Sequence, residues 1–344
     1  MTPKNKNIVS DGFHRRRRRY MSVTLILTAA VLSLCTAIML LGNTVYSPAA
    51  VWKVLTGENI KGATFAVRTL RLPRMLSGLL AGFAFGMAGS TFQTMLRNPL
   101  ASPDIIGVTA GSNAAAIFLL IMMNLSGTAV SLGAVLGGVL TSAFIYLLSR
   151  GGKFEGGRLI LIGLGVQAML NAFISYLLLR APQHDVPAAY RWLSGSLNGV
   201  QLSDIPMLAI IIIIFSPITI LLGKHLRILE LGENSAVTLG VNTDRTRILL
   251  ILSAVISIAF ATATTGPIAF VSFLSGPISS KLVGAGTQNE LPAGLVGAVL
   301  VLLADLIGQF AFNTKFPVGV ITGILGAPYL IFLLIRMNKT GGAS

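Results

Sequence analysis

The chain has 344 residues, of which 53% are hydrophobic and only 11% carry a charge. Soluble domains carry about 25% charged residues, so this composition excludes an ordinary soluble protein and indicates an integral membrane protein. The formal net charge of +15 could suggest nucleic acid. The basic residues lie between apolar segments, however, so we expect contact with membrane lipid and no nucleic-acid partner.

The first predicted element is a basic cytoplasmic tail, residues 1–20, followed by an apolar span. Five consecutive arginines at residues 15–19 could form an arm that binds nucleic acid. Positive charge beside a span more commonly holds that end in the cytoplasm, and we adopt this interpretation. The single cysteine, Cys35, lies inside the span, which leaves neither a disulfide framework nor a cysteine metal cluster.

Apolar runs and their breaks predict ten spans, and therefore an all-α polytopic membrane protein. One transmembrane domain would cover residues 21–336, and residues 337–344 would form a second cytoplasmic tail. The predicted spans are residues 21–42, 72–95, 104–123, 128–149, 158–180, 204–223, 246–265, 270–283, 291–312 and 318–336.

The basic residues predict that both termini are cytoplasmic. With the N-terminus inside, 18 of the 26 lysines and arginines fall on inner segments and 8 on outer segments, as the positive-inside rule requires. Five of the eight outer residues lie between positions 53 and 74. Arg71 and Arg74 in that stretch either reach the outer lipid headgroups or serve a partner.

Two patterns predict how the spans are arranged. Gly78, Gly82, Gly86 and Gly89 recur every three or four residues and form a smooth helix face, which favours close helix packing in lipid and could also line a path. In each half of the chain a long span is followed by a short one interrupted by Pro and Gly, "NPLASPDIIGV" and "GPIAFVSFLSGPISS". This correspondence predicts an inverted repeat.

Residues for enzymatic chemistry are absent from the sequence pattern. The three histidines are scattered, and no Walker A motif is present, so any ATP hydrolysis belongs to another chain. Asp305 is the one carboxylate well inside a long predicted span. Such a residue could couple transport to an ion or a proton, but more often it is a hydrogen-bonded packing residue or faces a wet cavity.

The inner segment "RILELGENSAVTLGVNTDRTR", residues 227–247, predicts one or two short amphipathic helices. It could lie on the lipid surface. Helices that do so are typically rich in Lys and Arg, however, and residues 228–241 contain neither. We therefore expect this segment to dock a protein partner.

Several segments resemble a known family. They are "LRLPRMLSGLLAGFAFGMAGSTFQTMLRNPLASPDIIGVTAGS", "LELGENSAVTLGV", "TGPIAFVSFLSGP" and "FPVGVITGILGAPYLIFLL". They are similar to the permeases of ATP-binding-cassette importers for iron(III)-siderophores and vitamin B12. The resemblance covers residues 21–336, and "RLILIGLGVQAML" and "WLSGSLNG" favour the ferric-siderophore members over those for cobalamin or haem.

The resemblance implies a ten-helix permease in the bacterial cytoplasmic membrane with no cofactor of its own. Its partners would be a homodimeric ATPase, a second permease and an extracytoplasmic substrate-binding protein. The implied docking residues for the binding protein are Arg71, Arg74 and Lys315. The implied ATPase-coupling residues, in a segment at about 227–243, are Leu229, Leu231, Gly232, Glu233, Ala236, Leu239 and Gly240. The implied cytoplasmic gate comprises Asn98, Leu100, Glu155 and Gly156.

The sequence departs from the family at two places. Gln309 stands where the family has a third docking arginine, for which Lys315 or the partner permease could compensate. Gly276 and Pro277 stand in place of a Pro-His pair. The first departure favours a heterodimer with a paralogous permease.

Overall fold

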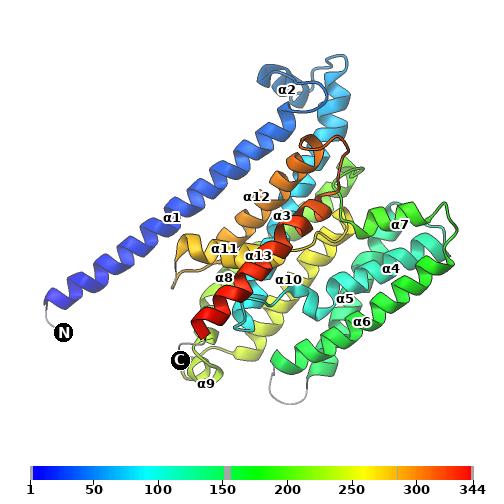
Figure 1. Cartoon of the computed structure of the whole chain (residues 1–344). Helices are drawn as coiled ribbons and strands as arrows, with labels where there is room; N and C mark the ends of the chain where they lie inside the picture. The colour runs from blue at the N-terminus through cyan, green and yellow to red at the C-terminus, as the bar shows by residue number, and fades with distance from the viewer. Residues whose placement is uncertain (1–2, 151–155, 285, 342–344) are drawn as a thin grey trace.

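The computed structural model describes residues 3–150, 156–284 and 286–341, and these residues form helices and connecting segments without any strand (Figure 1). Three short helical elements are the π-helix η1 (Phe65–Arg71) and the 3-10 helices η2 (Pro103–Ile106) and η3 (Leu202–Asp204). The α-helices are α1 (Pro3–Leu40), α2 (Pro48–Leu55), α3 (Leu72–Met95), α4 (Val108–Met122), α5 (Thr128–Ser149), α6 (Gly156–Arg180), α7 (Val186–Leu193), α8 (Ile205–Glu230), α9 (Glu233–Thr238), α10 (Thr243–Thr265), α11 (Val271–Val283), α12 (Glu290–Phe310) and α13 (Val318–Gly341).

The ten predicted spans all correspond to helices of the structure. Seven stretches of the described chain are long and apolar enough to cross a membrane. They contain α1, α3, α5, α6, α8, α10 and α12. Helices α4 and α11, which are shorter, and α13, whose apolar part is Val318–Leu333, correspond to the three remaining predictions. The all-α polytopic fold is therefore confirmed.

Three helices extend well beyond the spans predicted for them, and one of these is α13, which ends at Gly341 rather than at residue 336. Helix α1 begins at Pro3, so the arginine run is helical and continuous with the first span. Arginine is a good helix former. Arg19 also donates to the carbonyls of Lys281 and Leu282 at the end of α11, both at 2.8 Å. Helix α8 continues to Glu230, seven residues past the predicted end at 223. Its last turn therefore belongs to the predicted coupling segment.

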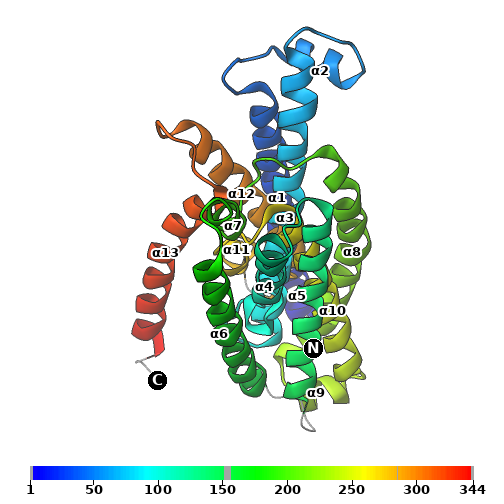
Figure 2. The ribbon, with the colours of Figure 1, turned by 90° about the vertical axis from the view of Figure 1, so that its right-hand side faces the viewer.

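The two ends of the helix bundle are distinct in Figures 1 and 2. Helix α2 lies at one end, while α9 and both chain termini lie toward the other. Because the basic residues predict cytoplasmic termini, we call the α9 end inner and the α2 end outer. Helix α3 runs from outer to inner and α10 from inner to outer. These opposite directions are what an inverted repeat requires, and the repeat itself stays a prediction.

Helices α3, α10 and α12 form the centre of the bundle. Each buries most of its apolar length, whereas α1, α5, α6 and α8 bury less than a third of theirs. Buried side chains of α3, α8 and α10 form one continuous cluster that includes Phe92, Leu208, Leu250 and Ile258. The outer helices therefore present most of their surface to lipid or to other protein.

Helices α3 and α12 touch backbone to backbone through the predicted glycine stripe. A Cβ at Gly82 would lie 2.6 Å from the carbonyl oxygen of Gly297, and one at Gly86 would collide with the carbonyl of Ala293. Gly89 meets the carbonyl of Ser272 on α11 in the same way. The stripe is thus a packing surface, as small residues at regular spacing in a membrane predict.

A proline inside α11 is accommodated by a side chain from α3. Pro277 has no N–H, so the carbonyl of Phe273, four residues earlier, loses its helical partner. The side-chain amide of Gln93 donates to that carbonyl at 3.0 Å. The space beside Gly276 is filled by the Gln93 carbonyl oxygen, so a side chain at position 276 would displace Gln93.

Candidate functional site

The outer residues singled out in the sequence lie around one cavity of about 370 Å³. It opens between the end of α1, the start of α3, the segment after α7 and the end of α12. The polar and charged residues that line it are Asn43, Thr44, Tyr46, Thr69, Arg71, Arg74, Asn198, Gln201, Gln309 and Lys315. The structure thus brings together Arg71, Arg74, Lys315 and Gln309, the last of which stands where the family has an arginine.

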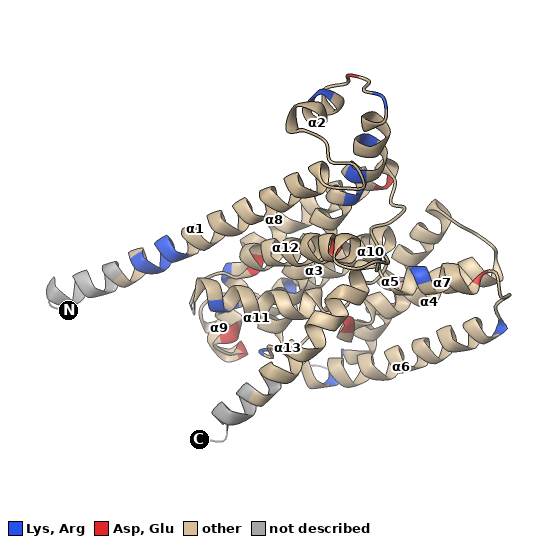
Figure 3. Cartoon of the chain, turned by 45° about the horizontal axis from the view of Figure 1, so that its top comes forward, with Lys and Arg blue, Asp and Glu red and all other residues tan. Residues whose placement is uncertain are grey.

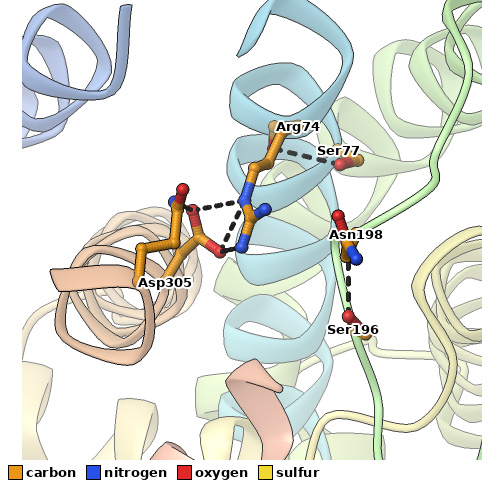
Figure 4. A network of polar contacts seen from close by, with 6 residues as sticks. Arg74, Ser77, Ser196, Asn198 and Asp305 are labelled. Carbon is orange, nitrogen blue, oxygen red and sulfur yellow. Dashed lines mark hydrogen bonds and ion pairs between the residues drawn. The ribbon is translucent and has the colours of Figure 1, made fainter. Parts of the chain in front are cut away.

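Arg74 is held inside the protein by a carboxylate from another span (Figure 4). Its Nη2 lies 2.7 Å from Oδ1 of Asp305, and its Nε lies 2.9 Å from both carboxylate oxygens. The Asp305 side chain is fully buried, and the Arg74 side chain is 17% exposed. Such a two-point contact is the strong form of an arginine–carboxylate pair. It accounts for the lone carboxylate near the outer end of α12.

Gln309 completes this cluster one helical turn beyond Asp305. Its side-chain amide donates to Oδ2 of Asp305 at 2.7 Å. An arginine at this position would place a second positive charge beside the same carboxylate. The residue that departs from the family pattern therefore has a structural function here, because it satisfies a buried acceptor.

Arg71 is also engaged within the chain. Its guanidinium donates to the carbonyls of Met39 and Leu40 at 2.9 Å and to that of Thr44 at 2.6 Å. It also lies 4.9 Å from the centre of the Tyr46 ring. Met39 and Leu40 end α1, where unpaired carbonyls attract a positive charge. Arg71 therefore caps the first span while lining the cavity.

Exposed basic side chains are available elsewhere at the outer end. Lys61, Arg68 and Lys315 are exposed, and Lys53 pairs with Glu58 at 3.3 Å on the surface. Figure 3 shows lysines and arginines around α2 and the start of the next helical stretch. Arg68 is one of the five basic residues between positions 53 and 74 that were predicted to lie outside, and no role was predicted for it. Its exposure makes it a better candidate for an external contact than Arg74.

At the inner end, the predicted coupling segment forms the last turn of α8, a tight connection and α9. Gly232 has a φ of +115° and Gly240 a φ of +80°, values that glycine adopts without strain. Leu229, Ala236 and Val241 are buried against one another. Of the predicted coupling residues, Leu229 and Ala236 therefore hold the segment in shape, while the two glycines make its turns.

Three apolar side chains of this segment are exposed among polar ones. Leu231 is 68% exposed, Val237 59% and Leu239 60%. We call these three residues the inner apolar patch. Val237 was not singled out from the sequence, although its place in the short helix could have indicated it. Glu233 forms an ion pair with Arg247 of α10 at 3.1 Å, so it fastens α9 to the bundle.

The predicted gate residues lie in the turn that follows α3. The side-chain oxygen of Asn98 accepts from the Leu100 amide at 2.9 Å, and the backbone carbonyl of Asn98 accepts from the Ala101 amide at 3.0 Å. Gly156, the first residue of α6, lies beside Leu96, whose Cδ2 would be 3.0 Å from a Cβ at that position. The structure therefore brings Gly156 to this turn, whereas Glu155 lies outside the described residues.

Helix α6 exposes a polar face in the middle of its span. Asn171 and Ser175 are exposed together with the small residues Gly165, Ala168 and Ala172. A side-chain amide is costly against lipid hydrocarbon. This face is therefore suited to a water-filled path or to another protein. It was not identified from the sequence, although Asn171 within an apolar run was the available signal.

In the described part of the chain, no group of three or more His, Cys, Asp or Glu residues could hold a metal ion. The charged and polar groups gather instead at the outer cavity and on one face of α6, and the inner end presents the inner apolar patch. This arrangement suits contacts with other proteins and passage of a solute rather than bond-making chemistry.

Comparison with known proteins defines the class. The FecCD transport family matches residues 24–336. A solved structure described as an inward-facing conformation of a metal-chelate type ABC transporter superimposes with a TM-score of 0.82 at 27% identity, covering 92% of this chain and all of that one. The molecule is therefore a multi-pass membrane transport protein with the fold of an ABC-transporter permease. The chain belongs to the FecCD transport family.

Two curated relatives come from one transport system of Escherichia coli. The ferric enterobactin transport system permease protein FepG is 39% identical over 290 residues, covering 84% of this chain and 88% of FepG. The ferric enterobactin transport system permease protein FepD is 34% identical over 319 residues, covering 91% of this chain and 95% of FepD.

Proposed function

We propose that this chain is the permease subunit of an ATP-driven importer that carries iron(III)-siderophore complexes across the bacterial cytoplasmic membrane. The observation that carries the proposal is the match over nearly the whole chain to permeases such as FepG, whose name gives ferric enterobactin as the cargo of its system. An iron chelate needs no protein ligands, because the siderophore fills the coordination sphere of the metal. The path needs only to be wide and weakly binding.

The inner apolar patch is the proposed contact for a separate ATPase chain. Leu231, Val237 and Leu239 are exposed on a segment whose other apolar residues are buried, so the backbone beneath the patch is held firmly. A small, rigid apolar surface at the cytoplasmic end is suited to a groove on a partner. Two ATPase chains would serve two permease subunits.

The outer cavity and the exposed bases near it are the proposed contact for an extracytoplasmic binding protein. Arg71 and Lys315 line the cavity, and Arg68 is exposed beside it. Acidic side chains on the binding protein would be attracted to this region, and such charges mainly set the rate and register of docking. Because the charge of Arg74 is balanced by Asp305, we assign it to the support of this surface rather than to contact.

A second permease is the proposed neighbour of the polar face of α6. FepG and FepD are named as permeases of the same system, which supports a pair of related but unequal subunits here. With two such faces opposed, the path for the chelate would run between the subunits. Asn171 and Ser175 would then meet water rather than lipid.

The alternative of an ion-coupled carrier that uses Asp305 loses support from the geometry. Its carboxylate is fully buried, paired with Arg74 and hydrogen-bonded to Gln309. Both carboxylate oxygens are engaged by residues of this chain, whereas a carrier site must gain and release its ion or proton.

Uptake measurements test the proposal. Labelled ferric siderophores, cobalamin and haem are offered to a strain in which this gene is deleted, with and without the gene on a plasmid. We expect the gene to restore uptake of at least one ferric siderophore. Restored uptake of cobalamin or haem alone would replace the proposed cargo, and no restored uptake would overturn the proposal.

A further inference from the structure

The turn that ends α3 contains a residue in an unusual backbone conformation. Arg97 has a φ of +50°, which non-glycine residues rarely adopt. The amide of Arg97 donates to the Thr94 carbonyl at 3.2 Å and the amide of Asn98 to the Gln93 carbonyl at 3.0 Å. This is the Schellman pattern, whose left-handed position is usually glycine. An arginine at this position therefore adopts a backbone conformation that costs free energy relative to glycine.

The side chain of Arg97 makes a contact that glycine could not supply. Its Nη2 donates to the carbonyl of Leu229 at 2.6 Å. That carbonyl also accepts from the Gly232 amide at 3.2 Å, and it belongs to the last turn of α8, where a positive charge is favourable. One residue therefore ends α3 with its backbone and caps α8 with its side chain.

The two ends that Arg97 joins belong to the two inner sites described above. Leu229 is buried with Ala236 and Val241 in the base of the coupling segment. On the other side, Asn98 and Leu100 follow Arg97 directly in the gate turn. Movement of the base of the coupling segment would pull on the guanidinium, and through it on the start of the gate turn.

The same turn of α3 is anchored on its far side. Gln93, whose carbonyl accepts from the Asn98 amide, uses its side-chain amide to satisfy the Phe273 carbonyl freed by Pro277. The last turn of α3 is therefore held to α11 through Gln93. A force applied through Arg97 would act mainly on residues 97–101, beyond that anchor.

We propose that Arg97 is a positioning residue that transmits movement of the coupling segment to the gate turn through its hydrogen bond to the Leu229 carbonyl. The inference rests on the proposed function, because it requires an ATPase on the coupling segment. It predicts that, without the Arg97 side chain, a change in the ATPase no longer changes the gate, while the permease stays folded.

The test measures gate accessibility in the complete complex of permeases, ATPase and binding protein in proteoliposomes. Cys35 is replaced by alanine and Leu100→Cys reports the gate through its reaction with a water-soluble thiol reagent, with and without ATP. Arg97→Gly removes the side chain at a position that favours glycine, and Arg97→Met keeps the bulk but removes the donor. Arg150→Gly, at the inner end of α5, is the matched control for the loss of an arginine.

We expect ATP to change the labelling rate of the thiol introduced at position 100, both in the parent and in Arg150→Gly. In both Arg97 variants the ratio of the rates with and without ATP should fall about tenfold, as expected for the loss of one hydrogen bond from a charged donor. The thermal midpoint of Arg97→Gly should not fall, and the ATPase should still co-purify.

Full ATP dependence of labelling in either Arg97 variant would overturn the inference, as would ATP-independent labelling in the parent. Failure of the proposed function is a separate result. It would appear as a parent complex that transports no ferric siderophore, whereas labelling at position 100 still reports on Arg97.

Discussion

Arg74 and Asp305 are 231 positions apart in the sequence and are joined by three hydrogen-bond contacts near the outer end of the bundle. The sequence left two charges unexplained, an arginine at the outer end of one span and a carboxylate inside another. The pair explains both, because the two charges neutralise each other. A buried pair gives little net stability over apolar residues, but loss of one partner leaves an unpaired charge. The pair therefore makes α3 and α12 depend on each other.

Asp305→Asn tests this dependence at the residue scale. We expect a loss of about 2–4 kcal/mol in the free energy of unfolding, because Arg74 would keep its charge in a largely buried position. The measurement is thermal or denaturant unfolding of the purified permease in detergent. Arg74→Met combined with Asp305→Leu should recover most of the loss. A single variant as stable as the parent would contradict the assigned role.

The same pair explains what the sequence could not show. The sequence predicted Arg71 and Arg74 at the outer end of a span, because apolar periodicity and charge counting locate span ends, and the structure adds that both line one cavity. Their partners could not be found, because the Asp305 carboxylate and the carbonyls of α1 come from helices whose neighbours are set by packing. A lone Asp and an outer arginine at similar predicted depth were the only available signal.

At the scale of elements, hydropathy predicted all ten spans but not the inner ends of α1 and α8. The arginine run and the residues after 223 are polar, so they carry no membrane signal, yet both continue helices that lie against other parts of the bundle. The glycine stripe, in contrast, did carry information about how the helices pack. Its spacing predicted that α3 packs closely against another helix, but not that this helix is α12.

Gly86→Ala tests the stripe. A methyl group at this position would meet the Ala293 carbonyl of α12, so we expect a loss of about 1–3 kcal/mol in unfolding free energy through overpacking. Gly165→Ala is the matched control, because a Cβ on that helical glycine of α6 meets nothing within 4 Å. The control should be neutral or slightly stabilising. Equal effects of the two changes in unfolding experiments would argue against the packing contact.

Leu239→Asp tests the inner apolar patch. The side chain is 60% exposed, so the permease should keep its thermal midpoint, while a charge placed in an apolar interface should weaken ATPase binding by at least about tenfold. Co-purification of the ATPase with the tagged permease measures this. Asn234→Asp adds the same charge to an exposed position of α9 and should retain the ATPase. Retention by both variants would count against the patch.

For the whole molecule, burial separates a compact centre from a looser periphery. Helices α3, α10 and α12 are mostly buried, whereas α6 is among the most exposed and carries the polar face with Asn171. A single chain gives this face no cover. In the proposed assembly of two permeases, this face of α6 would line the path between the subunits.

Thiol accessibility tests the environment of α6 in the assembled transporter. In a background with Cys35 replaced by alanine, Asn171→Cys should react with a membrane-impermeant thiol reagent, because its helix face would line water. Leu140→Cys on α5, a residue 66% exposed among apolar neighbours, should be protected by lipid. Equal protection of the two cysteines in every nucleotide state would contradict a path along α6.

The backbone contact between α3 and α12 also restricts how the permease can change shape. Sliding one helix along another requires side chains that can exchange partners, and here carbonyl oxygens occupy the space that such side chains would need. With Arg74 and Asp305 locked across the same pair, shear between α3 and α12 is blocked. We therefore expect these two helices to move as one rigid body, with the opening and closing movements in the more exposed helices around them.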